Sequence, residues 1–312
     1  MEEQECQQPE GDPNSDLLYH YTEQDGLLGI LESQAFRATD IRFLNDTEEF
    51  EDGLRTAIRI AKQASAEAGE AGQKVVEYLE DNLRFSFSTQ PVFSVSLTGP
   101  LKNYETLPSS IDDPGDRLNM WRSYSGRGIA YSIGLPREGY CANIEGIDRQ
   151  ECSYRQDTKE LYLNEVFNNF VDLLNTCLKK RIERTEAGTS LEQSMDEVRS
   201  DLRTGLDRIL PDMKAQVAAC KHEGFWEERE WRLTVALPSD DRRVFHTSGR
   251  FGITPRVYFE LRGPDGLLPI KRIVVGPCPH MAEALESLKG MLTRKGYSKV
   301  QVCASQIPYR NW

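Results

Sequence analysis

The stretch that decides the fold is Phe225–Leu237, FWEEREWRLTVAL. Read as a strand, it has two different sides, because successive side chains of a strand point to opposite faces of a sheet. The mainly apolar side carries Arg229, Trp231, Leu233, Val235 and Leu237. The polar side carries Glu228, Glu230, Arg232 and Thr234. This pattern predicts either a well-solvated edge strand or a strand that lines a polar cleft.

The composition is that of a chain able to build its own core. It has 312 residues, of which 38% are hydrophobic and 28% charged, enough for one large domain or two small ones. No window approaches the roughly 18 apolar residues of a membrane span, and residues 1–15 lack the pattern of a signal peptide. We expect a disordered lead over 1–15, a single catalytic-type domain over 16–312, a cytoplasmic location and no membrane partner.

Charge and cysteine usage exclude several classes of function. The net charge of −12 disfavours non-specific binding of nucleic acid, which normally requires a basic surface. The seven cysteines form no C-x-x-C pair, and the four histidines form no H-E-x-x-H motif. The sequence therefore indicates neither a disulfide framework, nor a zinc knuckle, nor a histidine-based metal site.

The expected elements are short strands separated by helices. Strands are expected at 17–21, 36–44, 91–99, 129–135, 140–154, 243–247, 257–261, 271–275 and 300–305, with Thr22 as the cap of a short helix. Further helices are expected at 47–64, 71–83, 116–124 and 281–292. Apolar residues at helical spacing predict a helical-hairpin insertion at about 158–220. Without βαβ alternation, this order favours an α+β fold with a mixed, largely antiparallel sheet.

Three of the expected strands carry polar residues on one side. His20 lies in the first, Ser94 and Ser96 in the third, and Glu228 and Glu230 in the quoted stretch. If these strands are neighbours, their polar sides converge on one cleft suited to binding a ribose and stabilising positive charge on it. The simpler readings are a core histidine, a solvated serine face and a surface ion-pair ladder.

Six motifs together resemble a widespread bacterial domain family of unknown function. They are YHYT (19–22), RFLND (42–46), MWRSY (120–124), GIA (128–130), FWEEREWR (225–232) and IPYR (307–310). The resemblance extends over about 17–310. That family is in turn similar in motif order to the ADP-ribosyltransferase superfamily, whose split β-sheet with flanking helices binds NAD in a cleft. The resemblance therefore implies this fold and NAD as a substrate.

The resemblance also implies roles for single residues. Glu230 would bond the nicotinamide ribose and stabilise an oxocarbenium-like transition state, while Glu228 would orient or deprotonate the acceptor. His20 would hold the adenosine-side ribose, and Ser94 and Ser96 would support the nicotinamide side. The other NAD-binding candidates are Tyr21, Thr22, Arg42, Asn45, Trp121, Tyr124 and Arg232, although Asn45 is most simply a helix cap. Trp121 and Tyr124 are the candidates for stacking on nicotinamide.

Two classes of function follow from these observations. The first is an NAD-dependent ADP-ribosyltransferase-like enzyme that modifies a protein, nucleic acid or small molecule, or hydrolyses NAD, as a bacterial toxin or anti-phage defence effector. The second is a non-catalytic ligand-sensing or protein-interaction module that uses 158–220 as its partner surface. A third hypothesis is a nuclease or phosphoryl-transfer enzyme with a divalent ion at Glu228 and Glu230.

Overall fold

The chain folds into two compact units, each made of segments that are far apart in sequence. The computed structural model describes residues 16–44, 47–66, 69–100, 113–126, 128–166, 176, 191–249 and 252–309. Unit 1 comprises Met1–Ala35, Leu97–Asn143 and Leu261–Trp312, and unit 2 comprises Phe36–Ser96 and Ile144–Glu260. The expectations for residues 1–15, for Asn45, and for 167–175 and 177–190 of the hairpin lie outside the described residues.

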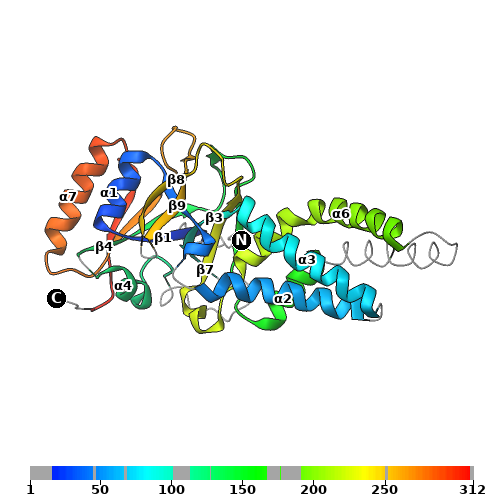
Figure 1. Ribbon diagram of the computed structural model, residues 1–312. Coiled ribbons are helices and arrows are strands. Elements are labelled where there is room, and N and C mark those ends of the chain that lie inside the picture. Colours follow the sequence, from blue (N-terminus) through cyan, green and yellow to red (C-terminus); the bar gives the residue numbers. More distant parts are fainter. Residues whose placement is uncertain are drawn as a thin grey trace, which may run out of the picture. The chain divides into compact units, whose positions relative to one another are not determined.

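Unit 1 is a small sheet with helices packed on it (Figure 1). Its strands, in spatial order, are β12 (Gln301–Ala304), β11 (Arg272–Val275), β4 (Ala130–Pro136) and β1 (Leu17–Glu23). The β11–β12 pair is parallel, and the β4–β11 and β1–β4 pairs are antiparallel. The helices are α1 (Gln24–Ser33), α4 (Leu118–Tyr124) and α7 (Met281–Arg294). A short pair, β5 (Cys141–Ala142) with β10 (Leu261–Arg262), completes the unit.

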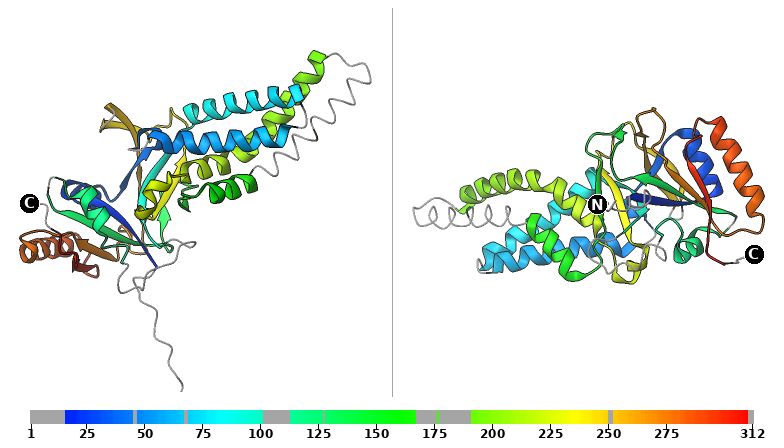
Figure 2. Two further views of the ribbon diagram at one scale, coloured as in Figure 1. Left: turned by 90° about the horizontal axis from the view of Figure 1, so that it is seen from below. Right: turned by 180° about the vertical axis from the view of Figure 1, so that it is seen from behind.

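Unit 2 joins a sheet to a group of long helices. Antiparallel pairing runs from β3 (Val92–Thr98, to Ser96 in this unit) through β2 (Phe36–Asp40) and β9 (Gly252–Phe259) to β8 (Phe245–Gly249). Strand β7 (Glu230–Ala236) pairs with both β3 and β6 (Asp148–Glu151). Helices α2 (Thr47–Ser65), α3 (Gly69–Thr89) and α6 (Leu191–Ala219) run side by side (Figure 2) and share one apolar core.

These elements form an α+β fold with mixed, mostly antiparallel strand pairing, as the sequence predicts. The expected strands and helices are present in the described residues with shifted boundaries. Helix α6 is the second half of the expected hairpin, and it packs against α2. Gly53 permits this close approach, because a Cβ at that position would lie 2.9 Å from the carbonyl oxygen of Val217.

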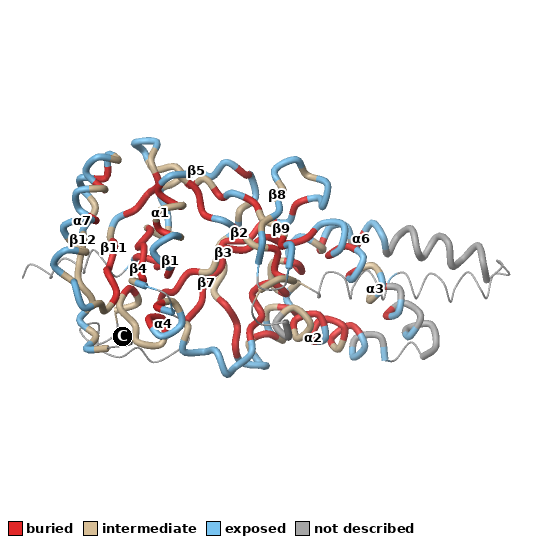
Figure 3. Tube along the Cα trace, turned by 60° about the vertical axis from the view of Figure 1, so that its left-hand side comes forward, coloured by how far each residue is buried: buried red, intermediate tan, exposed pale blue. Residues whose placement is uncertain are grey.

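The stretch Phe225–Leu237 forms a strand over only part of its length. Residues 223–228 form a 3-10 helix, η3 (Glu223–Glu228), Arg229 has a left-handed backbone with φ of 44°, and β7 begins at Glu230. Both sides of β7 are buried, including Glu230, Arg232 and Thr234, as Figure 3 shows along this strand. Of the two alternatives that the pattern left open, the well-solvated edge strand is therefore excluded, because tertiary packing covers the polar side of the strand.

The first strand also differs from its prediction. Strand β1 continues through Thr22 to Glu23, so Thr22 is a strand residue and not a helix cap. Glu23 occupies the N-cap position of α1 without a side-chain capping bond. Strand β4 explains the extension, because its partners for Thr22 and Glu23 are Tyr131 and Ala130. Cross-strand pairing thus overrides the local capping preference of threonine.

Lys214 is a buried lysine that links α6 to the end of α3. Its side chain is 1% exposed, and its Nζ donates to the carbonyl oxygens of Ser86 at 3.0 Å and Gln90 at 2.9 Å. The Nζ also lies 5.5 Å from the ring centroid of Phe87. A cation suits the negative end of a helix. Burial nevertheless lowers the pKa of Lys214 to about 8.

We therefore expect a pH-dependent difference in stability between wild type and Lys214→Met. The folded-state pKa of about 8 lies below the usual 10.5, so between these pH values the unfolded chain binds more protons. The free energy of unfolding of wild type should rise with pH across this window by about 1–2 kcal/mol relative to Lys214→Met, allowing for solvent screening. Urea unfolding at pH 7.5 to 10.5 measures this, and parallel pH profiles would contradict the prediction.

Candidate functional site

The start of β7 carries a buried cluster of charged side chains in unit 2. Glu230 is 3% exposed, and its Oε1 accepts a hydrogen bond from Nε of Arg232 at 2.9 Å. Its Oε2 pairs with Nζ of Lys221. The guanidinium of Arg232 also donates through Nη1 to the carbonyl oxygen of Ala218 at 2.6 Å, at the end of α6. Both oxygens of Glu230 are therefore held by cations, Arg232 from β7 and Lys221 from the segment that follows α6.

Lys221 connects this buried carboxylate to a more accessible one. Its Nζ donates to Oε2 of Glu228 at 2.8 Å, while Lys221 itself is 5% exposed. The side chain of Glu228 is 35% exposed. The Nζ also lies 5.3 Å from the ring centroid of Phe225, which is a cation–π distance. One lysine thus fixes two carboxylates, one buried and one reachable from solvent.

The backbone at Arg229 produces this arrangement. Alternation along a continuous strand would place Glu228 and Glu230 about 7 Å apart on one side. Instead, the left-handed residue Arg229 joins η3 to β7, and both carboxylates reach the same ammonium group. A left-handed non-glycine residue costs about 1–2 kcal/mol, so the surrounding contacts have to maintain it.

Contacts from the segment around residue 152 hold the start of β7. The hydroxyl of Tyr154 accepts a hydrogen bond from the backbone N–H of Glu230 at 2.7 Å. The N–H of Cys152 donates to the carbonyl oxygen of Glu230 at 2.9 Å. The N–H of Lys221 donates to the carbonyl oxygen of Ser153 at 3.0 Å. Both partners of the ion pair are therefore tied to one segment.

The cluster keeps Glu230 ionised. Burial alone would raise the pKa of its carboxyl, but Arg232 and Lys221 outweigh burial and hold the pKa well below its usual range. Burial raises the pKa of Tyr154, whose hydroxyl stays protonated. The site is thus a fixed anion between two cations, with Glu228 as the accessible carboxylate.

The two serines of β3 lie on the same side of the sheet as this cluster. Strands β3 and β7 are neighbours, and the N–H of Leu237 donates to the carbonyl oxygen of Pro91 just beyond their ends. Because side chains alternate, Ser94 and Ser96 then share a side with Glu230 and Arg232. Ser94 is 3% exposed and Ser96 is half-buried, so this side of β3 is not a solvated face.

Arg42, the remaining candidate among the described residues of unit 2, does not join the cluster. Arg42 forms an ion pair with Asp40, with Nη2 of the arginine 2.6 Å from Oδ2 of the aspartate. Asp40 is fully buried, and it also accepts a hydrogen bond from the backbone N–H of Arg42. Arg42 therefore lies within η1 (Ile41–Phe43) and forms a local ion pair with Asp40, the N-cap residue of that helix.

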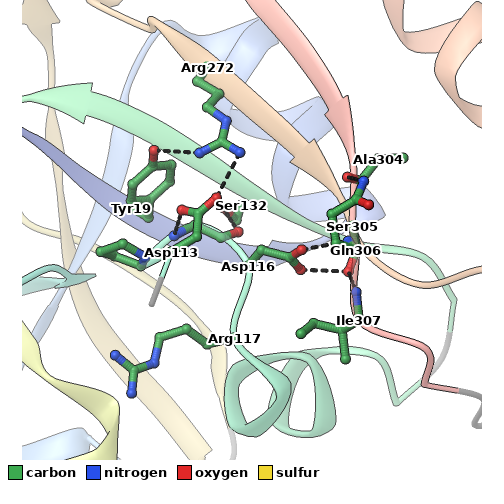
Figure 4. Close-up of polar contacts among 12 residues, drawn as sticks. Tyr19, Asp113, Asp116, Arg117, Ser132, Arg272, Ala304, Ser305, Gln306 and Ile307 are labelled. Atoms are coloured by element: carbon green, nitrogen blue, oxygen red, sulfur yellow. Dashed lines mark hydrogen bonds and ion pairs between the residues drawn. The ribbon is translucent and has the colours of Figure 1, made fainter. Parts of the chain in front are cut away.

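A second polar network, in unit 1, holds the segment 113–117 in place (Figure 4). Nη2 of Arg272 pairs with Oδ2 of Asp113 at 2.8 Å, and its Nη1 donates to the hydroxyl of Tyr19 at 3.0 Å. Ser132 donates through Oγ to the carbonyl oxygen of Gly115 at 2.8 Å. A Cβ at Gly115 would lie 2.4 Å from the ring of Tyr19, so this close approach requires glycine.

Two of the expected NAD-binding residues are parts of this network. Trp121 is fully buried and donates through Nε1 to Oδ1 of Asp116 at 2.6 Å. The hydroxyl of Tyr21 donates to the carbonyl oxygen of Pro114 at 2.8 Å and accepts from the N–H of Arg117 at 3.1 Å. Burial raises the pKa of Tyr21. In this structure Tyr21 and Trp121 position the 113–117 segment and α4.

The remaining candidates of unit 1 lie around β1. Tyr124 is half-buried, with its ring centroid 6.2 Å from that of Tyr21. His20 is half-buried on β1, opposite Ile133 of β4. Thr22 is buried, and its hydroxyl lies against Gly26 of α1. His20 belongs to unit 1, and the Glu230 cluster belongs to unit 2.

Sequence reasoning missed several residues that organise these sites. Lys221 and Tyr154 complete the Glu230 cluster, yet they lie 9 and 76 positions away from Glu230 in the chain. Asp113 precedes the helix expected at 116–124, and Asp116 is the first residue of that expected helix, but neither is among the predicted site residues. Their spacing in Asp-Pro-Gly-Asp, a turn-forming sequence before a helix, was the one available signal.

The central part of the chain is similar to a known protein family. Residues 120–233 match the family described as "Protein of unknown function (DUF2971)". The match includes most of α4, Tyr154, Lys221 and the start of β7. No curated protein and no solved structure matches the chain. The similarity to a family of unknown function is thus supported, while the one to ADP-ribosyltransferases stays a prediction.

Among the helices in the described part of the chain, none is long and apolar enough to cross a membrane. Within the same residues, no group of three or more histidine, cysteine, aspartate or glutamate side chains is arranged to hold a metal ion. Among the described cysteines, Cys141, Cys152, Cys220, Cys278 and Cys303 form no disulfide.

Proposed function

We propose that the chain is a cytosolic NAD-consuming enzyme of the ADP-ribosyltransferase type. The observation that carries the proposal is the pair Glu228 and Glu230 held by one lysine, with one carboxylate 35% exposed and the other fixed in the interior. The motif order and the α+β fold support the same reading. Breaking the bond between nicotinamide and ribose develops positive charge on the sugar, which a fixed carboxylate stabilises.

In this proposal the carboxylates of Glu228 and Glu230 have different roles. Glu228 is reachable from solvent, so in this proposal it is the residue that touches the ribose. Glu230 acts through Lys221 and is a positioning residue. As the glycosidic bond breaks, its electron pair leaves with nicotinamide, and the ribosyl carbon is attacked by water or by an acceptor hydroxyl, amine or carboxylate. Where the nucleophile carries a proton, that proton passes to Glu228 or to solvent.

The turn next to Glu228 fits the chemistry of an NAD substrate. Phe225 is 40% exposed and Trp226 is 43% exposed, and both belong to η3 together with Glu228. Exposed aromatic rings beside a carboxylate provide a surface for a planar, positively charged nicotinamide ring. These rings replace Trp121 as our preferred stacking candidates, because Trp121 is fully buried.

The decisive test is nicotinamide release from NAD by the purified full chain. We expect turnover in wild type and a fall in kcat of about 100-fold in Glu228→Gln, with KM little changed, because the lost interaction acts mainly in the transition state. Glu223→Gln is the matched control, since Glu223 is exposed on the same turn. Absence of turnover and of NAD binding at millimolar ligand would reject the proposal.

A second candidate is a non-catalytic binding module. The full pairing of Glu230 with Lys221 and Arg232 favours it, because a carboxylate so engaged is also a stabilising element. The exposed rings of Phe225 and Trp226 would then contact the ligand or partner. Calorimetric NAD binding without nicotinamide release, lost in Trp226→Ala but kept in Glu228→Gln, would favour this candidate.

Consumption of NAD would also indicate a biological role for the protein. An enzyme that depletes NAD would suit a toxin or an anti-phage effector, with the acceptor being a protein, a nucleic acid, a small molecule or water. Cellular NAD measured after induced expression tests this setting. A fall in wild type that is absent in Glu228→Gln supports it, and unchanged NAD in both contradicts it.

A further inference from the structure

One side of strands β3, β2 and β9 in unit 2 carries two arginines among hydroxyl groups. The strand register places Thr39 opposite both Ser94 of β3 and Arg256 of β9. The next pair on the same side is Arg37 with Tyr258. Directly paired residues have Cβ atoms about 5 Å apart. Side chains from segments more than 200 residues apart therefore meet in one place (strands in Figure 3).

Hydroxyl groups, and not carboxylates, hold the guanidinium of Arg256. Its Nη1 donates to Oγ1 of Thr39 and its Nε to Oγ1 of Thr247, both at 2.8 Å. Within the described residues, neither Arg256 nor Arg37 forms an ion pair with a carboxylate. Burial, followed by the positive charge of Arg37, lowers the pKa of Arg256. The N–H groups of Nη2 remain to bind something else.

The hydroxyl of Ser94 provides a second, independent observation. Ser94 is 3% exposed, and its buried Oγ has no hydrogen-bond partner among the described residues. A buried hydroxyl without a partner is unfavourable and uncommon in folded proteins. Its neighbour across the strand is Thr39, which itself contacts Arg256. Thr39 thus lies between the unsatisfied hydroxyl of Ser94 and the guanidinium of Arg256, which lacks an anion.

We propose that Arg256, Arg37, Thr39 and Ser94 form a binding site for a phosphate or pyrophosphate group. Guanidinium groups bind phosphate oxygens through paired N–H groups, and hydroxyls donate to the remaining oxygens. A bound dianion would relieve the repulsion between the two arginines and provide a partner for Ser94. This site does not depend on NAD cleavage, because a phosphate can bind here whether or not Glu228 reacts.

An aromatic pair beside the arginines suits a nucleotide as the source of the phosphate. The rings of Phe245 and Tyr258 stack with their centroids 4.4 Å apart, and Tyr258, which lies opposite Arg37, is 37% exposed. A base can stack on such a surface while its phosphate contacts the arginines. Free pyrophosphate would use the arginines and hydroxyls alone. Comparing the two ligands distinguishes these sources.

The test is calorimetric titration of the full chain with pyrophosphate and, separately, with ADP. Arg37→Met should weaken the binding of pyrophosphate at least tenfold, and it should fold normally because Arg37 is exposed. Ser94→Ala should weaken binding several-fold while leaving thermal stability equal or higher, since it removes a buried unpaired hydroxyl. Arg243→Met is the control, because Arg243 is exposed and paired with Asp241.

Each outcome decides the proposal. Tighter binding of ADP than of pyrophosphate identifies a nucleotide site, and equal binding identifies a phosphate site without base recognition. Absence of binding of both ligands to wild type at millimolar concentration would overturn the proposal. So would folded Arg37→Met and Ser94→Ala variants that bind as wild type does. Neither result bears on nicotinamide release, which is measured separately.

Discussion

Replacing Glu230 with glutamine should lower the free energy of unfolding by about 3 kcal/mol, at the lower end of the range for breaking a buried ion pair. The change leaves Lys221 and Arg232 as buried cations without their shared anion. The protein should still fold, because Lys221 still contacts Glu228 and Arg232 still contacts the carbonyl oxygen of Ala218. Urea unfolding of the full chain measures the change.

A double-mutant cycle tests whether the loss comes from the ion pair. The charges are removed singly in Glu230→Gln and Lys221→Met, and together in the double variant. Because both groups are buried and in contact, the combined loss should be smaller than the sum of the single losses by at least 1 kcal/mol. Glu223→Gln is the exposed control and should change stability by less than about 0.5 kcal/mol. Additive losses would contradict the assignment.

The contribution of Glu230 should also depend on pH. Its folded-state pKa is depressed by Arg232 and Lys221, which outweigh the effect of burial, while its unfolded value is about 4.5. A depressed carboxyl pKa stabilises the fold above the unfolded value, and the stabilisation is lost as pH falls below that value. The difference between wild type and Glu230→Gln should therefore shrink below pH 4.5. A difference that is constant from pH 7 to 3.5 would argue against an ionised Glu230.

Replacing Asp116 with asparagine is the second change with a large expected effect, about 2–4 kcal/mol. Three donors converge on this carboxylate, namely Nε1 of Trp121 at 2.6 Å, Oγ of Ser305 at 2.5 Å and the N–H of Gln306 at 2.6 Å. An amide can accept through only one of its two terminal atoms, so at least one donor would face an N–H group. Hydrogen bonds to a charged acceptor contribute about 1.5–3 kcal/mol each.

The control for Asp116→Asn is Asp25→Asn, the same change at an exposed position of the first turn of α1. Only a loss of helix-dipole interaction is expected there, about 0.3–1 kcal/mol. Thermal unfolding and the near-ultraviolet circular dichroism of Trp121 should report loosening of α4 in Asp116→Asn. Equal stability of the two variants would show that the carboxylate does not tie α4 to the end of β12.

The sequence located elements better than it located burial. Alternation and composition placed β3, β4, β11, α2 and α7 nearly correctly, because both reflect local preferences and which side of an element is buried. They did not decide whether Glu230 and Arg232 face solvent or the interior. Their burial depends on Lys221 and the end of α6, and no local pattern contains that information.

In the candidate sites, some residues were recognisable from the sequence and others only from the fold. Glu228, Glu230 and the two serines were recognisable as polar residues on expected strands. Lys221, Tyr154 and Arg256 were not, because each is a single polar residue whose meaning depends on a neighbour brought by the fold. Arg256 meets Thr39 across 217 positions of sequence. Contacts of that kind are set by strand pairing, which a single sequence does not reveal.

What the sequence determined by itself is the α+β class, most strand and helix positions, and the importance of the stretch beginning at Phe225. Tertiary structure decided where that stretch becomes a strand. The backbone turns at Arg229 because ion pairs and hydrogen bonds at Lys221 and Tyr154 fix Glu230 there. Local propensities differ by tenths of a kcal/mol per residue, whereas a broken buried ion pair costs several, so the tertiary contacts prevail.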